Sequence, residues 1–287
     1  MNYEITGHTG LTALLGSPVS HSISPQMHNE AFRQLGLDYV YLAFDVESGR
    51  LKETFDGLKA INIKGFNLTM PLKTAIIPYL DELTPAARLA GAVNTVYCEN
   101  GTWIGHTTDG IGYMRSVADA GHDIIGGKMT LLGAGGAATA ICVQAALDGV
   151  ASIDMFKRKN ATFDQTAEFC QRLSKETGCN IRLFDITDSN RLADSISDSN
   201  ILTNATNVGM APDTNSSVLE DASILHRDLI VSDIIYNPRE TLLMKQAKAA
   251  GCQCFNGLYM LLFQGAAAFQ CWTGQEMPID IIKKKYF

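Results

Sequence analysis

The most constraining feature of this sequence is the stretch 128–141, where a short apolar run stops at a glycine cluster and an alanine-rich helical pattern follows. Gly133 permits a tight turn, Gly135 lets the backbone approach a pyrophosphate, and the small Ala138 lets a helix pack closely on the preceding strand. The N–H groups and positive dipole end of that helix would then face the phosphates. Glycine-rich turns also occur without a ligand, but a second strand expected at 151–156 completes a strand-helix-strand unit. The stretch therefore predicts a dinucleotide-binding turn.

The bulk properties place the chain in a broad class. Its 287 residues correspond to about two domains, each long enough to bury a core of its own. A hydrophobic content of 46% with 18% charged residues is typical of soluble globular proteins. The net charge of −7 argues against a nucleic-acid surface or an anionic membrane as the main partner. An anionic ligand must therefore be held by local positive groups.

The cysteines, the start of the chain and its longest uncharged stretch indicate where the protein is located and whether it binds a metal. The seven cysteines form no C-x-x-C pair, and the polar start Met1-Asn-Tyr-Glu lacks the pattern of a secretory leader, so we expect reduced thiols and a cytoplasmic protein. Cys252 and Cys254 share one face of a short strand, which favours burial; no metal site is expected. The uncharged stretch 249–275 is broken by Gly, Asn and Gln and predicts a buried helix, not a membrane span.

Strands and helices alternate in the first half of the chain. Strands are expected at 11–15, 39–44 and 61–69, and helices after Ser24 as the N-cap, over 51–58, and from Pro85 to Gly91. This alternation implies a mainly parallel sheet whose strand C-termini share one edge. Just past such ends lie Ser22, Ser24, Asn67, Thr69 and Lys73. Asn100-Gly101, between runs at 93–98 and 102–105, predicts a β-hairpin.

The second half is predicted to be a doubly wound, Rossmann-type domain. Strands are expected at 129–132, 151–156, 181–184, 201–205, 229–235 and 252–255, and helices at 136–147, 162–177, 189–197 and 240–250. We predict an α/β fold of two domains, 1–110 and 111–257, joined by a helix at 111–121. Helices at 258–273 and 278–285 are expected to pack back on the first domain and complete it.

The end of the second strand of the Rossmann-type domain bears on the choice of cofactor. In an NAD site an acidic residue about 20 positions past the glycine motif binds the ribose 2′-OH. Here the strand ends in Lys157-Arg158-Lys159-Asn160, and Asp154 lies inside the strand, where alternation directs it away from the tip. Arginine can grip a 2′-phosphate through two parallel N–H bonds. The pattern favours NADP over NAD; the alternative is a basic trio that only solvates an exposed turn.

Two residues of the first domain are candidates for proton transfer during the oxidation of an alcohol, Lys73 and Asp109. The motifs around them resemble those of the shikimate dehydrogenase family, most closely its branch that also accepts quinate. The similarity covers nearly the whole chain and lies in Ser22-Ile-Ser24-Pro25, Asn67-Leu-Thr69-Met-Pro71-Leu-Lys73, Gly91-Ala-Val-Asn94-Thr95, Thr108-Asp109-Gly110, Gly133-Ala-Gly-Gly136-Ala, Asn204-Ala-Thr206, and Gly257 with Gln264-Gly265-Ala266. Several motifs in one order are far more specific than any single motif.

The resemblance implies an NAD(P)-dependent interconversion of shikimate and 3-dehydroshikimate, a step of aromatic amino acid biosynthesis, by an N-terminal substrate domain and a C-terminal cofactor domain. Lys73 would be the general acid/base at the C3 oxygen, with Asp109 beside it. The implied substrate contacts, besides these two, are Ser22, Ser24, Thr69, Asn94, Tyr236 and Gln264. The implied cofactor contacts are Gly133, Ala134, Gly135, Gly136, Ala137, Lys157, Arg158, Lys159, Asn160, Ala205, Thr206, Ile234 and Gly257.

Each of these assignments has a plainer structural alternative. Ser24 could serve only as a helix cap, Lys73 could be an exposed lysine at the start of a helix, and Asp109 could be an N-cap. Asn94 could satisfy hairpin backbone, and Gln264 could bond internally. His21, His28 and His106 are expected to be structural. The chain also departs from the family pattern, since Thr107 stands where the family usually has Asn, and Lys157 and Asn160 replace the Asn and Asp of the dual-cofactor branch.

Two other functions stay open at this point. One is a catabolic dehydrogenase that uses NAD and converts quinate to 3-dehydroquinate. The other is a non-catalytic module that senses a nucleotide, against which the presence of both Lys73 and Asp109 argues. The sequence leaves a monomer and a homodimer both open.

Overall fold

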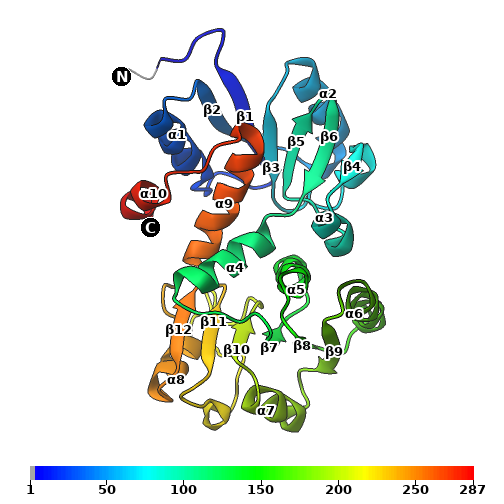
Figure 1. Ribbon diagram of the computed structural model, residues 1–287, viewed down its shortest axis with the longest axis vertical. Helices are drawn as coiled ribbons and strands as arrows, with labels where there is room; N and C mark the ends of the chain where they lie inside the picture. Colours follow the sequence, from blue (N-terminus) through cyan, green and yellow to red (C-terminus); the bar gives the residue numbers. More distant parts are fainter. Residues whose placement is uncertain (1–3) are drawn as a thin grey trace. The chain divides into compact units, whose positions relative to one another are not determined.

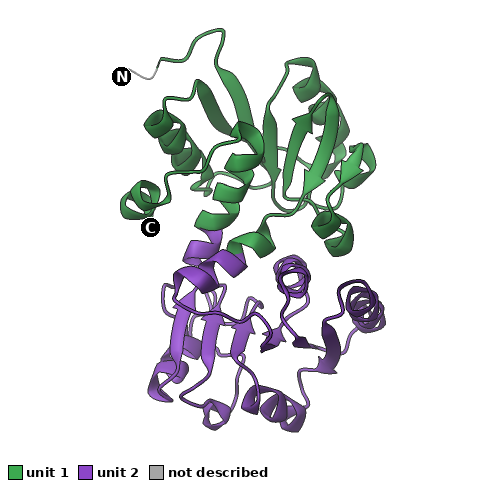
Figure 2. Cartoon of the chain, in the orientation of Figure 1, with its two compact units in different colours: residues 1–112, 262–287 green, residues 113–261 purple. Residues whose placement is uncertain are grey.

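The computed structural model describes residues 4–287 of the chain. The first three residues, part of the polar start on which the expectation of no leader depends, lie outside this range. The described chain forms two compact units (Figure 2): unit 1 extends to Gly112 and includes Leu262–Phe287, and unit 2 is Tyr113–Leu261. Both boundaries fall inside helices, α4 (Asp109–Asp119) and α9 (Leu258–Thr273).

Unit 2 is built on a six-stranded sheet in which every neighbouring pair is parallel (Figure 1). The strand order β9-β8-β7-β10-β11-β12 is the 3-2-1-4-5-6 order of Rossmann folds, so the predicted fold class is confirmed. Its elements are β7 (Lys128–Leu132), α5 (Gly136–Asp148), β8 (Ser152–Lys157), α6 (Phe163–Thr177), β9 (Asn180–Asp185), α7 (Ser189–Ser197), β10 (Ile201–Asn204), η3 (Ala222–Ile224), β11 (Ile230–Asp233), α8 (Leu242–Ala249) and β12 (Gln253–Asn256).

Unit 1 contains a mixed six-stranded sheet of order β2-β1-β3-β5-β6-β4. The pairs β1·β2, β1·β3 and β4·β6 are parallel, and β3·β5 and β5·β6 are antiparallel. Its elements are β1 (Gly10–Gly16), α1 (Ser24–Leu35), β2 (Tyr39–Asp45), η1 (Ser48–Arg50), α2 (Leu51–Ala60), β3 (Gly65–Leu68), η2 (Ile77–Tyr79), β4 (Glu82–Leu83), α3 (Pro85–Ala90), β5 (Thr95–Glu99), β6 (Thr102–His106) and α10 (Ile279–Tyr286).

Local sequence signals explain most of these boundaries. The hairpin between β5 and β6 turns at Asn100 and Gly101, whose φ angles of 52° and 86° suit a tight type I′ turn. Helix α3 begins after Thr84, whose hydroxyl accepts a hydrogen bond from the Ala87 N–H. The strand expected at 61–69 is shorter: β3 spans only Gly65–Leu68, since the chain turns at Ile61 and Asn62, where Asn62 has φ 58°. The short strand β4 was not predicted.

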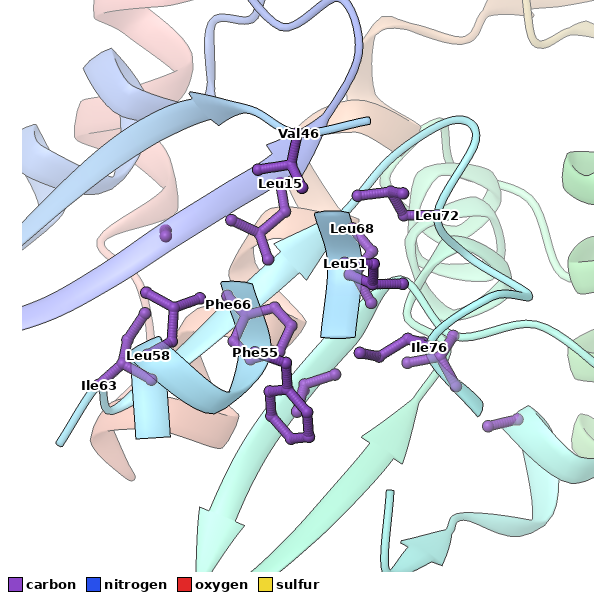
Figure 3. Packing of buried hydrophobic residues seen from close by; sticks show 14 residues of the cluster. Leu15, Val46, Leu51, Phe55, Leu58, Ile63, Phe66, Leu68, Leu72 and Ile76 are labelled. Carbon is purple, nitrogen blue, oxygen red and sulfur yellow. The ribbon is translucent and has the colours of Figure 1, made fainter. Parts of the chain in front are cut away.

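The two faces of the unit 1 sheet are packed differently. Figure 3 shows Leu51 and Phe55 of α2 directed toward Phe66 and Leu68 of β3, within a core cluster that also includes Leu15. Because side chains alternate along a strand, Asn67 and Gly65 of β3 face the opposite side. On that side Trp272 of α9 donates a hydrogen bond from Nε1 to the Val96 carbonyl at 3.1 Å. The α2 face is therefore an apolar core, and the α9 face mixes aromatic and polar groups.

A buried histidine lies within the aromatic group on the α9 face. His28 of α1 stacks on Tyr41 with ring centroids 4.4 Å apart, and its ring is also close to Phe269 and Trp272 of α9. Neither of its ring nitrogens has a hydrogen-bond partner. Burial lowers the pKa of His28 from 6.5 to about 3, so the imidazole is neutral in the folded protein at ordinary pH. The expectation that His28 is structural agrees with this position.

Helices α1 and α10 are joined by an ion pair at the side of unit 1. Glu30 is nearly buried, and its carboxylate contacts Lys285 of α10 at 2.8 Å as well as Arg33. The hydrogen bond from Arg33 holds the pKa of the Glu30 carboxyl at about 2, against the opposing effect of burial. This contact attaches the C-terminal helix to the first helix of the chain. Within residues 4–287, none of the helices is long and apolar enough to cross a membrane.

The lowered pKa of the buried His28 predicts how the free energy of unfolding of unit 1 depends on pH. In the unfolded chain its imidazole titrates near 6.5, whereas in the folded chain it titrates at about 3, so the unfolded chain binds the extra proton between these values. The contribution to folding stability is therefore intact above pH 6.5 and is lost as the pH falls, by up to about 1.4 kcal/mol per pH unit. We expect His28→Leu to reduce this loss, measured by urea unfolding at pH 5 and pH 7.5.

The exposed His8 supplies the control for this measurement. A His8→Gln variant should keep the pH dependence of the wild type. If His28→Leu and the wild type lose the same free energy of unfolding between pH 7.5 and pH 5, the buried imidazole does not titrate as described.

Candidate active site

An ion pair between two elements far apart in the sequence is the central feature of unit 1. The Lys73 ammonium nitrogen lies 2.6 Å from Oδ2 of Asp109, with 29% and 13% of the two side chains exposed. The partial exposure leaves the pair accessible while most of its surroundings are protein. Opposite charges in such a place attract more strongly than in water. The structure therefore brings together the two residues that the sequence singled out for proton transfer.

Backbone contacts hold both partners of this pair. Lys73 lies in the turn after β3, and its carbonyl accepts a hydrogen bond from the Val93 N–H at 2.8 Å. Asp109 is the first residue of α4, where the positive end of the helix dipole favours a carboxylate. Lys73 is therefore not the exposed lysine at a helix start that the plainer alternative assumed.

Asn94 connects the ion pair to the rest of the sheet. Its Nδ2 donates to Oδ1 of Asp109 at 2.7 Å, and Oε1 of Gln264 lies 3.5 Å from the same nitrogen. Its Oδ1 accepts the Thr108 backbone N–H at 2.7 Å. Asn94 therefore lies beside the ion pair and Gln264 lies beside Asn94, and the buried Asn94 does more than satisfy hairpin backbone.

The serines before α1 differ from the expectation in one respect. Ser24 is the first residue of α1, and the cap position is Ile23, without a side-chain cap bond, so the predicted N-cap was wrong. Ser24 is buried and its hydroxyl lies near that of Tyr41, while the hydroxyl of Ser22 accepts the Ser24 N–H at 3.2 Å. The Ser24 side chain thus lies beside a tertiary neighbour instead of capping the helix. Thr69 follows β3 directly, and its N–H bonds to the Leu15 carbonyl at 2.9 Å.

In unit 2 the strand register places the cofactor candidates at one edge of the sheet. Residues paired across neighbouring strands are Phe184, Phe156, Leu132, Asn204, Asp233 and Asn256. The residues that follow these positions include Lys157, Gly133, Ala205, Ile234 and Gly257. Since all six strands are parallel, these residues leave the sheet at its carboxyl edge, where ligands of open α/β sheets bind.

The glycines at this edge permit close backbone approaches. Gly133 has φ 110°, and a Cβ there would lie 2.7 Å from the Ala205 carbonyl oxygen and 3.2 Å from Thr206. A Cβ at Gly257 would lie 1.8 Å from the Ile234 oxygen. The structure therefore brings Gly133 together with Ala205 and Thr206, and Gly257 together with Ile234.

The start of α5 fits a bound phosphate group. Gly135 occupies the cap position, and no side chain caps this helix end, so its first N–H groups are left for another acceptor. Both Gly135 and Gly136 are exposed, and a Cβ on either would meet open space. Ala134 and Ala137 flank them. These residues suit a dinucleotide pyrophosphate, which the glycine pattern predicted.

The residues of the basic turn after β8, 157–160, have two different roles. The Lys157 ammonium turns back to the start of α6 and bonds to Asn160, at 3.1 Å, and to Thr162 and Thr166. Arg158 and Lys159 are exposed. Lys157 and Asn160 therefore shape the turn, and Arg158 and Lys159 supply its exposed cations.

The carboxylate of Asp154, in the strand before this turn, is directed away from it. Asp154 is buried in β8, where Arg182 contacts it at 2.7 and 2.8 Å. Burial opposes its charge, but the hydrogen bonds from Arg182 and Ser195 outweigh this effect and lower its pKa. Asp154 is therefore directed away from the tip, as alternation predicted.

Sequence reasoning missed Asp185 at the end of β9. Its register partner is Lys157, and the backbone N–H groups of Thr187 and Lys159 lower the pKa of its carboxyl. One acidic group thus lies next to the basic turn. The neighbouring strand of a parallel sheet ends at the same edge, which was the available signal.

A second buried network supports the edge residues of unit 2. Asp233 accepts hydrogen bonds from Thr241 at 2.7 Å and from Asn204 at 3.1 Å, and burial raises the pKa of its carboxyl. Oδ1 of Asn204 in turn accepts the N–H and hydroxyl of Thr206. This network orders the segment that contains Ala205 and Thr206. Tyr236, three residues after Asp233, is 45% exposed in unit 2.

The remaining candidates are placed as follows. His106 of β6 bonds through its ring to the Thr84 hydroxyl at 2.8 Å, and burial lowers its pKa. His21 is exposed. All seven cysteines are free thiols; Cys252 is buried, as expected, but lies just before β12, and Cys254 is only half-buried. Among residues 4–287 there is no group of His, Cys, Asp and Glu residues that could hold a metal ion.

Comparison with known proteins identifies the family. Residues 14–96 match the model of the shikimate dehydrogenase substrate binding domain, and residues 257–285 match the shikimate 5′-dehydrogenase C-terminal domain. A shikimate dehydrogenase (NADP(+)) of Listeria monocytogenes is 53% identical over 284 residues, which cover 99% of this chain and 98% of the relative.

Solved structures agree with this result. The crystal structure of shikimate 5-dehydrogenase from Listeria monocytogenes, in complex with shikimate and NAD, has a TM-score of 0.97 at 52% identity, covering 100% of this chain and 99% of that one. Quinate dehydrogenase from Corynebacterium glutamicum, in complex with NAD, has a TM-score of 0.85 at 28% identity, covering 96% and 98%. The quinate enzyme is thus the more distant of the two. The chain belongs to the shikimate dehydrogenase family.

Proposed function

We propose that this protein is an NADP-dependent shikimate dehydrogenase, which interconverts shikimate and 3-dehydroshikimate in aromatic amino acid biosynthesis, with Lys73 and Asp109 as its acid-base pair. The observation that carries the proposal is the 2.6 Å contact between these two side chains in a member of this family. A module that only sensed a nucleotide would have no use for a partly exposed proton-transfer group.

The residues of unit 1 can perform the proton half of an alcohol oxidation. Removing a hydride from the carbon of a secondary alcohol leaves a hydroxyl proton that must go to a base. A neutral Lys73 amine accepts this proton and becomes an ammonium, and in the reverse reaction the ammonium returns it to the carbonyl oxygen. Asp109 stabilises the ammonium by its opposite charge. NADP⁺, when bound, supplies the hydride acceptor.

Substrate selection would use the hydroxyl and amide groups of unit 1. Ser22, Ser24 and Thr69 are suited to the carboxylate and hydroxyls of a small polyol acid, and Asn94 and Gln264 to its hydroxyls. A site that bonds to hydroxyls rejects analogues that lack them, because its own polar groups would be left unpaired. We assign Tyr236 of unit 2 to the substrate carboxylate.

We further assign residues 1–110 with 258–287 to substrate binding and catalysis, and residues 111–257 to the cofactor. In the second domain the pyrophosphate would bind at Gly133–Ala137 and the 2′-phosphate at Arg158 and Lys159, next to Lys157 and Asn160. Ala205, Thr206, Ile234 and Gly257 would line the rest of the cofactor site. The seven free thiols support a cytoplasmic location. A homodimer is the assembly to test by sedimentation.

The function is tested by measuring kcat/KM for shikimate and quinate, each with NADP⁺ and with NAD⁺. We expect shikimate with NADP⁺ to be the best pair. Lys73→Ala should lower kcat by about 10²–10⁴-fold, because it removes the group that accepts the proton. Lys64→Ala, which changes an exposed lysine elsewhere in unit 1, is the control and should keep full activity.

Equal rates for Lys73→Ala and the wild type would remove Lys73 from the mechanism. A tenfold preference for quinate and NAD⁺, or cofactor binding without turnover, would replace the proposed function.

The basic turn predicts the cofactor preference. Arg158→Ala should lower kcat/KM for NADP⁺ by about tenfold or more, corresponding to about 1.4 kcal/mol, because it removes a charged partner of the 2′-phosphate. The value for NAD⁺ should change by no more than about twofold, since NAD⁺ has no 2′-phosphate. Arg172→Ala, at an exposed arginine of α6, is the matched control. Equal losses with both cofactors would show that Arg158 does not read the 2′-phosphate.

A further inference from the structure

Three polar residues without an assigned role lie side by side on the α9 face of the unit 1 sheet. Strand register and side-chain alternation put Tyr41 of β2, Asn67 of β3 and Thr95 of β5 on this face, with Asn67 and Thr95 directly opposite each other. Their exposed fractions are 0%, 6% and 0%. Polar groups so deeply buried are costly unless they are bonded.

These residues form one continuous hydrogen-bond chain. The Tyr41 hydroxyl donates to Oδ1 of Asn67 at 2.9 Å, and the hydroxyl of Ser24 lies near it. Nδ2 of Asn67 donates to the Asn94 carbonyl and to Oγ1 of Thr95, both at 3.0 Å. The amide nitrogen and the amide oxygen of Asn67 are therefore both hydrogen-bonded.

The chain continues to the ion pair through Asn94. The Thr95 hydroxyl donates to Oδ1 of Asn94 at 3.1 Å, and Nδ2 of Asn94 donates to Asp109 at 2.7 Å. The Thr108 backbone N–H, which can only donate, also points at this Oδ1. The Thr108 hydroxyl is a third possible donor to this oxygen, at 3.2 Å. With these donors at its oxygen, Asn94 is held with its N–H groups toward Asp109. A rotated amide would place its oxygen against the carboxylate.

We propose that Thr95, Asn67 and Tyr41 are positioning residues, which hold the Asn94 amide toward Asp109 and connect it to Ser24 at the substrate end of the site. This inference depends on the proposed function. Thr95 acts by fixing the orientation of Asn94, and Tyr41 by fixing Asn67 next to Ser24. The three side chains touch neither the ion pair nor a reacting atom.

The first test removes the Thr95 hydroxyl while keeping its shape. Thr95→Val should lower kcat for shikimate oxidation by about tenfold, the effect of one hydrogen bond of about 1.4 kcal/mol, and leave KM for NADP⁺ within about twofold. Thr95→Ser restores the hydroxyl and should recover kcat to within about twofold. Thr102→Val, in the same hairpin, is the matched control and should behave as the wild type.

The second test asks whether Tyr41 and Thr95 belong to one chain. Tyr41→Phe keeps the ring that stacks on His28 but loses the hydroxyl, and we expect a higher KM for shikimate because Ser24 loses a polar neighbour. In the double variant Tyr41→Phe/Thr95→Val, the loss in kcat/KM should be smaller than the product of the two single losses. Tyr79→Phe, at an exposed tyrosine, is the control.

The outcomes separate this inference from the proposed function. A wild type that does not oxidise shikimate overturns both. With an active wild type, the inference is overturned if Thr95→Val keeps kcat within twofold, if Thr95→Ser is as impaired as Thr95→Val, or if the losses of the double variant simply multiply. Recovery by Thr95→Ser together with a coupled double variant supports it, since loss of packing alone would produce neither.

Discussion

The contact between Lys73 and Asp109 is the constraint on which the rest of unit 1 depends. The two residues are 36 positions apart, and their side-chain atoms lie 2.6 Å apart. To meet, the turn after β3 and the start of α4 must be held against each other. The Val93 N–H holds the first through the Lys73 carbonyl, and Asn94 holds the second through the Asp109 carboxylate. The short segment 93–95, where the chain enters β5, therefore holds both partners of the ion pair.

The two faces of the unit 1 sheet explain why this contact can be both stable and reactive. The α2 face is closed by apolar side chains such as Phe55 and Phe66, which need no specific partners (Figure 3). The opposite face has a buried hydrogen-bond chain beside an aromatic group. Polar chains in a low dielectric are strongly directional, so they can fix an amide or a carboxylate where hydrophobic packing could not. The apolar face therefore supplies stability, and the polar face supplies orientation.

In unit 2 the geometry of a parallel sheet brings the cofactor candidates together. All of its strands end at one edge, so segments dispersed between residues 133 and 257 lie next to one another (Figure 1). Backbone contacts that only glycine permits bring the first and last of these segments against their neighbours. Beneath them, the Asp233–Asn204–Thr206 network fixes the loop after β10. A parallel sheet and a few glycines are thus sufficient to gather the cofactor candidates.

The sequence by itself determined the fold class, the order of the elements in unit 2 and the identity of the Lys73–Asp109 pair. The first two follow from local hydrophobic periodicity and turn residues, and the third from the motifs that resemble those of the family. The tertiary structure decided the rest: Ser24 is buried near Tyr41 instead of capping α1, and Lys157 folds back on α6. It also placed Asp185 beside the basic turn and joined Tyr41, Asn67 and Thr95 into one chain. Apart from the bonds of Lys157, these contacts link residues distant in the sequence, which come together only when the strands pair and the helices pack on the sheet.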